Sequence, residues 1–159
     1  ADLAMSNGAQ VIYINEGTRW ECDGWQFWCL YPGREAKEKS ENDRSMVLRV
    51  NASGTTFLFT GDISSEVENV LEKDGISDVD VLKTAHHGSE YSSSEGFLKA
   101  SEAKMAVISC SRKNRYGHPA PETLERMQKA DIQVYITMRT GAVIMPCKKG
   151  KFLLQTWLK

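Results

Sequence analysis

Two of the three histidines in this sequence, His86 and His87, lie side by side at the end of an apolar run, residues 79–85. A second apolar run, residues 55–60, is followed two positions later by a carboxylate, Asp62. Both runs are typical of short buried strands that end in polar loops. Neutral imidazole and ionised carboxylate are ligands of Zn²⁺, Mn²⁺ and iron. We therefore predict a metal site at the ends of these two strands.

Each of these residues also has a structural interpretation. Asp62 could be the N-cap of a following helix, His87 could cap the turn after the strand, and Ser89 could cap the element that follows. A further alternative makes Ser89 a nucleophile with His86 or His87 as its base, but adjacency in sequence is weak support for such a pair. Two strand ends that both carry metal-ligand chemistry favour the metal site, because open sheets place their sites at such rims.

The hydrophobic pattern predicts the elements that would position these residues. We expect strands at residues 11–15, 19–22, 25–31, 45–51, 55–60, 79–85, 104–109, 133–137, 141–146 and 151–158. We expect a frayed helix within residues 1–10, and helices at 63–74, 92–101 and 121–130. The aromatic residues of the first hairpin are interpreted as cross-strand packing and not as a platform for stacked bases. The order of elements predicts a mixed α/β domain whose sheet is covered by helices.

Length and composition indicate one globular domain. The chain has 159 residues, of which 41% are hydrophobic and 26% charged, and its formal net charge is −1. This charge creates no overall attraction to nucleic acid or anionic lipid. No apolar run approaches the roughly 18 residues that a membrane span requires, and the first residues lack the pattern of a signal peptide. We expect a soluble chain without membrane contact of its own, and the absence of an initiator Met suggests a piece of a longer protein.

The four cysteines, Cys22, Cys29, Cys110 and Cys147, show no Cys-x-x-Cys spacing. Because that spacing is absent, the sequence argues against a zinc ribbon or a dithiol redox motif. Cys22 and Cys29 flank a predicted hairpin turn and could lie opposite each other. We expect free thiols all the same.

Four segments resemble, in order and spacing, the C-terminal metallo-β-lactamase-fold domain of the ComEC family of competence proteins, the DNA-uptake channel of bacteria. They are Ser45-Met46-Val47-Leu48, Leu58-Phe59-Thr60-Gly61-Asp62, Leu82-Lys83-Thr84-Ala85-His86-His87-Gly88-Ser89 and the segment 114–119. The resemblance covers nearly the whole chain from about Val11. It implies that residues 1–159 are a single unit, the second half of an αββα sandwich.

The same resemblance implies roles for the metal-site residues. Asp62 would bridge two metal ions, Zn²⁺ or Mn²⁺, and His86 would be a terminal ligand, with His87 in or near the pocket. A bridging carboxylate suits a pair of metals that share one hydroxide and hold both oxygens of an in-line displacement. The implied activity is that of a metal-dependent phosphodiesterase or nuclease.

Three further residues would act on the substrate by this resemblance. His118 would bind or protonate a phosphate oxygen, and Ser89 and Asn114 would contribute hydrogen bonds. Next to His118 lies a basic loop that could hold phosphates: Arg112, Lys113 and Arg115. Such loops position a nucleic-acid backbone without reading its sequence, although a solvated turn is the common alternative.

The sequence also departs from the family pattern. The family's other metal motif, His-x-(His or Asp)-x-Asp-His, is absent, and Asn42 and Asp43 stand where the family's middle ligand would fall. A complete dinuclear centre therefore cannot be built from this chain. Asp43 could be an extra ligand, but we expect the chain to bind metal weakly or not at all. We expect it to be inactive alone. The alternative is a non-catalytic, degenerate domain that binds DNA or a protein partner.

The resemblance finally implies where the longer protein works and what it contacts. That protein would lie in the bacterial cell membrane, with this domain on the extracytoplasmic side. Its partners would be DNA and the missing first half of the fold. Since half a sandwich exposes apolar sheet surface, self-association is also expected.

Overall fold

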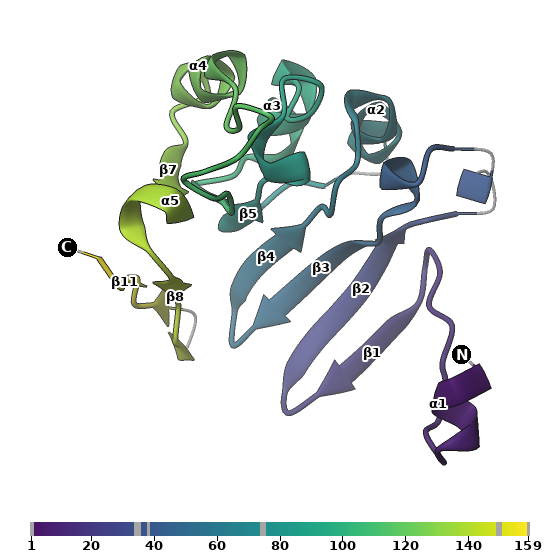
Figure 1. Ribbon diagram of the computed structural model, residues 1–159. Helices are drawn as coiled ribbons and strands as arrows, with labels where there is room; N and C mark the ends of the chain where they lie inside the picture. The colour runs from purple at the N-terminus through teal and green to yellow at the C-terminus, as the bar shows by residue number, and fades with distance from the viewer. Residues whose placement is uncertain (1, 34–35, 38, 74–75, 149–150, 159) are drawn as a thin grey trace.

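The computed structural model describes residues 2–33, 36–37, 39–73, 76–148 and 151–158, and one seven-stranded sheet dominates it (Figure 1). Its strands are β1 (Arg19–Cys22), β2 (Trp25–Tyr31), β3 (Val47–Ala52), β4 (Thr55–Phe59), β5 (Val81–Lys83), β6 (Met105–Ile108) and β7 (Gln133–Ile136). They lie in the sheet in chain order. The pairs from β1 to β4 are antiparallel and those from β4 to β7 are parallel. This confirms the predicted mixed α/β class.

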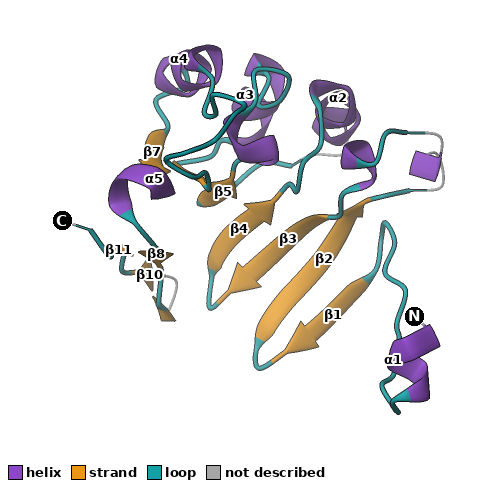
Figure 2. Cartoon of the chain, viewed as in Figure 1, coloured by secondary structure: helices purple, strands orange, loops and turns teal. Residues whose placement is uncertain are grey.

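Three helices connect the parallel strands and lie on one face of the sheet (Figure 2). They are α2 (Ser65–Lys73), α3 (Glu95–Ser101) and α4 (Pro121–Lys129). The shorter turns are α1 (Asp2–Ser6), η2 (Asn42–Arg44), η3 (Ala85–Gly88) and α5 (Thr137–Thr140). Among the described residues, every helix is too short or too polar to cross a bilayer.

The core lies between the sheet and these helices. Leu58, Leu82 and Ala106 are register partners on adjacent parallel strands, and each is fully buried. Phe97 of α3 and Met127 of α4 belong to the same buried cluster. Apolar side chains at helical spacing thus cover the strands that lead to the histidines, which gives the site a rigid base.

Some predicted elements are wrong. Residues 11–15 form no strand; instead the next amides bond to the end of β2, with Gly17 N donating to Cys29 O at 2.9 Å. The C-terminal strands shrink to two-residue pairs, β8 (Val143–Ile144) with β11 (Gln155–Thr156) and β9 (Cys147–Lys148) with β10 (Lys151–Phe152). Helix α5 was not predicted, since nothing in its four residues gives a helical period.

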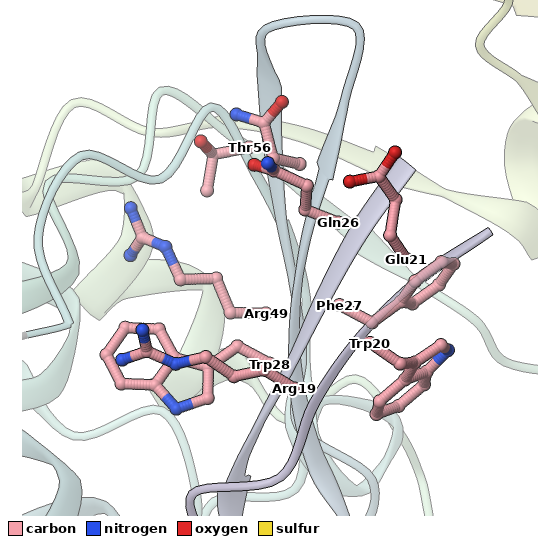
Figure 3. Close-up of a pocket in the computed structure, with 9 residues that line it drawn as sticks. Arg19, Trp20, Glu21, Gln26, Phe27, Trp28, Arg49 and Thr56 are labelled. Carbon is pink, nitrogen blue, oxygen red and sulfur yellow. The ribbon is translucent and has the colours of Figure 1, made fainter. Parts of the chain in front are cut away.

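The β1–β2 hairpin confirms the interpretation of its aromatic residues as cross-strand packing. Trp20 and Phe27 are register partners with ring centroids 4.9 Å apart, and Arg19 lies 4.2 Å over the Trp28 ring. Together with Arg49 and polar neighbours these side chains line an open pocket of about 510 Å³ (Figure 3). None of the predicted site residues lines it.

The same register shows that two cysteines do not pair. Cys22 lies opposite Trp25, whereas Cys29 lies opposite Leu48 on β3. All four cysteines are free thiols, as expected, and of the two in the hairpin only Cys29 is buried.

The sheet face away from the three helices carries apolar side chains. Phe57 and Phe59 lie on it in register with Val50 and Leu48, and their rings are 6.2 Å apart. Phe59 is 43% exposed. Leu48, Phe57 and Phe59 are at least partly exposed, and an apolar surface of this kind gains free energy when it is covered.

Candidate active site

Loops from three parallel strands meet at the C-terminal ends of those strands. Asp62 follows β4, His86 and His87 follow β5, and His118 lies in the loop after β6. Because adjacent parallel strands have their C-terminal ends on the same side of the sheet, the loops that follow them are neighbours. The first two loops are bonded directly, since His86 N donates to Gly61 O at 3.0 Å.

The histidine turn has a left-handed backbone. His86, His87 and Gly88 have φ angles of 45°, 57° and 82°. Side-chain-bearing residues seldom adopt positive φ, and such strain persists only where surrounding bonds enforce it. Here Ser89 N donates to His86 O at 3.0 Å and Ala120 N donates to Gly88 O at 2.8 Å. The second bond ties the segment after His118 to the turn.

The side chain that reaches Asp62 is His87, with Nε2 3.8 Å from Oδ1. On the other side of its ring, Nδ1 lies 2.7 Å from Ser109 O. A carbonyl only accepts, so Nδ1 must carry a proton and donate it. In the neutral ring Nε2 is then a lone pair facing a carboxylate oxygen. Two acceptors placed in this way could both be ligands of one cation.

His86 and His118 lie beside this pair. Their ring centroids are 5.7 Å apart, and those of His86 and His87 are 6.5 Å apart. His86 Nε2 also lies 3.5 Å from Asn42 Nδ2. Burial, together with the nearby charges of His86 and His87, lowers the pKa of His118 below its ordinary value. A neutral His118 can therefore donate one N–H bond to an anion, while its buried Nδ1 has no hydrogen-bond partner among the described residues.

Asn114 holds the loop that carries His118. Its Nδ2 donates to Ser111 O at 2.8 Å and to His118 O at 2.9 Å, and its Oδ1 accepts from His118 N at 2.8 Å. The amide is thus used within its own loop. A pocket of about 310 Å³ opens beside it, and its lining residues are His87, Ser109, Cys110, Ser111, Asn114, Tyr116 and His118.

Ser89 is 3% exposed and belongs to the turn. Its Oγ accepts from Tyr91 N at 3.3 Å, and its carbonyl accepts from the Thr123 hydroxyl at 2.8 Å. These contacts favour the capping interpretation over a nucleophile, which needs its oxygen in hydrogen-bond reach of a base.

The three basic residues of the loop next to His118 make different contacts. Arg112 Nε donates to Met138 O at 2.7 Å, which fixes that side chain against α5. Arg115 is exposed and its Nη2 donates to Tyr116 Oη at 2.7 Å. Lys113 is exposed as well, and its backbone N–H donates to Ser111 Oγ at 3.3 Å. Arg115 is the basic side chain joined by contact to a residue that lines the pocket.

This chain is similar in sequence to two known proteins. ComE operon protein 3 of Bacillus subtilis is 33% identical over 142 residues, covering 88% of this chain and 18% of that protein. Competence protein ComA of Neisseria gonorrhoeae is 38% identical over 134 residues, covering 83% of this chain and 19% of that protein. The chain belongs to the ComEC family. No family model matches the sequence.

The fold of this ComEC domain is metallo-β-lactamase-like. A crystal structure from Parabacteroides distasonis, named as a metal-dependent hydrolase, superposes with a TM-score of 0.56 at 14% identity. The match covers 86% of this chain and 61% of that one. At this identity the likeness shows the fold alone. The chain spans less than a fifth of the length of the curated ComEC relatives it matches.

The residues of this ComEC domain do not by themselves fit a metal ion. Within the described ranges, no group of three or more His, Cys, Asp or Glu side chains is arranged to hold one. Asp43, the possible extra ligand, has its oxygens engaged: Oδ1 accepts from Ser64 N at 2.7 Å and Oδ2 from Ser40 Oγ at 3.0 Å. Burial alone would raise the pKa of Asp43, but these bonds lower it below the ordinary value.

Two charged residues of the ComEC domain are at least half-buried, although the sequence did not single them out. Lys83 is half-buried at the end of β5; burial lowers its pKa, the charge of Asp62 acts the other way, and its Nζ donates to Thr84 O at 2.9 Å. Glu68 of α2 is fully buried. A lysine inside an apolar strand and a glutamate on the buried stripe of a helix are the signals that could have found them, because charged residues are seldom buried without a role.

Proposed function

We propose that this chain is the C-terminal part of a metal-dependent phosphodiesterase domain that cleaves DNA during its uptake by competent bacteria. One observation carries the proposal: the Nε2 lone pair of His87 faces the Asp62 carboxylate at 3.8 Å, with two more imidazoles beside it. The names of the relatives, competence protein among them, and the hydrolase fold support the same assignment.

The chain's own residues would divide the work. Asp62 and His87, with His86, would supply part of a ligand set for Zn²⁺ or Mn²⁺, which when bound would provide Lewis acidity. The remaining ligands would come from the first half of the domain. His118 would donate its N–H to a phosphate oxygen, and Asn114 would hold it there. The exposed Arg115 would attract the phosphate backbone.

The longer protein would lie in the bacterial cell membrane, with this domain on the extracytoplasmic side and DNA as its substrate. The apolar face that carries Phe57 and Phe59 would pack against the first half of the domain. Two sheets that pack in this way bury their inner faces against each other. This arrangement would explain why aromatic side chains lie on the side without helices.

The test is nuclease activity of the intact protein with added Mn²⁺ or Zn²⁺. We expect Asp62→Ala, His86→Ala and His87→Ala each to lower the rate by about 100-fold or more, the scale of losing one positioned catalytic group. Asp2→Ala, an exposed carboxylate on α1, is the matched control and should leave the rate unchanged. Unchanged activity in the Asp62→Ala protein would refute the proposed function.

The second candidate is a non-catalytic domain that binds DNA or a protein partner. The lack of a three-ligand group among the described residues favours it. The coding sequence upstream of residue 1 separates the two candidates. A His- and Asp-rich metal motif there supports the hydrolase, and its absence from the whole protein supports the binder.

The apolar face also predicts how the isolated chain behaves in solution. We expect the 159-residue chain to self-associate, and Phe59→Ser to shift it towards monomer, because the exposed ring contributes to the covered area. Static light scattering measures the mass. Tyr13→Ser, which removes an aromatic ring that is 75% exposed on the N-terminal segment, is the control. A clean monomer for the unmodified chain would contradict this prediction.

A further inference from the structure

We propose that Tyr116 is a stacking subsite for an unpaired nucleobase, so that the site takes single-stranded DNA in preference to duplex. This inference rests on the proposed function and names its substrate class. It starts from the exposure of Tyr116, which is 67% accessible to solvent although it lines the pocket beside His87 and His118. A large aromatic ring in this position contributes little to the core, and the exposed part of its surface can meet a ligand.

The Tyr116 ring is held in place by its neighbours in the loop. Tyr116 stacks on His118 with centroids 5.8 Å apart and an interplanar angle of 18°. His118 in turn packs edge-on to His86. The three bonds of Asn114 close the loop around them. The tyrosine therefore presents a pre-organised surface directly beside the imidazole assigned to the phosphate, which keeps the entropy cost of binding low.

A cation lies against the same ring. The Arg115 guanidinium carbon is 4.9 Å from the Tyr116 ring centroid, and its Nη2 donates to the tyrosine hydroxyl. Sites for single-stranded nucleic acid combine an aromatic ring for the base with a positive charge for the backbone. Tyr116 and Arg115 bring these two groups together at the mouth of a pocket of about 310 Å³.

This chemistry favours an unpaired strand. In a duplex the base faces are covered by neighbouring pairs, so a single exposed ring at a pocket has no face to stack on. An unpaired nucleotide can turn its base out onto an aromatic side chain. The loop 110–118 offers no helix that could enter a major groove.

Binding of a labelled single-stranded oligodeoxyadenylate to the full chain tests this inference, in EDTA and at low salt so that nothing is cleaved. We expect Tyr116→Ala to weaken binding by about 5- to 100-fold, the scale of one lost base–aromatic stack. Tyr116→Phe and Tyr116→Trp should bind within about threefold of the unmodified chain, since both keep a ring. Tyr13→Ala, which removes an even more exposed tyrosine elsewhere, should change nothing.

The oligonucleotide is varied as well. Replacing its bases by abasic sites should weaken binding to the unmodified chain and abolish the difference made by Tyr116→Ala. A duplex of the same length should be insensitive to Tyr116→Ala. If the alanine variant loses affinity equally for the abasic strand, Tyr116 serves only the loop, and the inference fails.

The outcomes separate this inference from the proposed function. If Tyr116→Ala binds the single strand as the unmodified chain does, while Asp62→Ala abolishes nuclease activity of the intact protein, the base subsite alone is refuted. If the unmodified chain binds no single strand and the intact protein cleaves no DNA, both are refuted.

Discussion

Replacing Glu68 by alanine will lower the free energy of unfolding by about 3–5 kcal/mol, a large share of the stability of a domain of this size. The carboxylate is fully buried and accepts two backbone N–H groups, from Ser93 at 2.5 Å and Ser94 at 2.8 Å. Its removal leaves both donors unpaired and opens a cavity between α2 and α3. Urea denaturation followed by circular dichroism measures the loss.

The Glu68→Ala substitution should also disturb the candidate active site, because Glu68 holds one side of the loop after the histidine turn. Arg126 of α4 holds the other side, donating to Ser93 O at 2.8 Å and Ser92 O at 2.9 Å. Burial raises the pKa of Glu68, while the N–H bonds from Ser94 and Ser93 and the charge of Arg126 act in the opposite direction. Glu68 and Arg126 therefore act as positioning residues for the segment that follows Ser89.

The control for this prediction is Glu66→Ala on the same helix. Glu66 is 72% exposed in its side chain and forms an ion pair with Lys39 at 3.0 Å. Exposed pairs of this kind contribute about 1 kcal/mol at most. Equal destabilisation by the two variants would show that the buried carboxylate has no special role.

The second large effect is expected at Gly88. Its φ of 82° is unfavourable for any side chain, and an added Cβ would lie 2.8 Å from Pro119 Cβ and 3.3 Å from Ile108 Cγ2. Gly88→Ala should therefore cost about 2–4 kcal/mol, from backbone strain together with overpacking. The turn must move to relieve the contact, so His86 and His87 should lose their geometry and the nuclease activity of the intact protein should fall.

Gly117→Ala is the matched control. Gly117 has a φ of 72°, but nothing lies within 4 Å of an added Cβ. It carries the backbone cost alone, about 1–2 kcal/mol. Denaturation midpoints of the two variants measure the difference, and an equal cost at both positions would mean that the contact with Pro119 is unimportant.

Strong local patterns predicted the fold well. The Asp23-Gly24 turn between aromatic runs predicted the β1–β2 hairpin, and the helical spacing of Val67 and Leu71 predicted α2. The segment 11–15 is also apolar, but it pairs with no strand among the residues that the structure describes. Whether such a segment joins a sheet depends on tertiary contacts that a local pattern does not contain. The two-residue strands of the C-terminus are below the length at which periodicity is informative.

The sequence predicted candidate residues that the fold brings close together, but not how their side chains face one another. Strand ends identified Asp62 and the two histidines, yet which imidazole faces the carboxylate depends on the left-handed turn at His86 and His87. Consecutive positive φ angles are imposed by the bonds to Gly61 and Ala120, which are distant in sequence. Tyr116 was missed because an aromatic residue in a loop shows its exposure only once the loop is folded.

The sheet order also bears on how the domain is made. Since β1 to β7 lie in the sheet in the order in which they are translated, the strand with which each new strand pairs has already been synthesised. Pairing between near neighbours keeps contact order low and loop-closure entropy small. A chain emerging from the ribosome can thus extend the sheet one edge at a time. In a long polypeptide this would leave the nascent domain few opportunities to pair with the wrong strand.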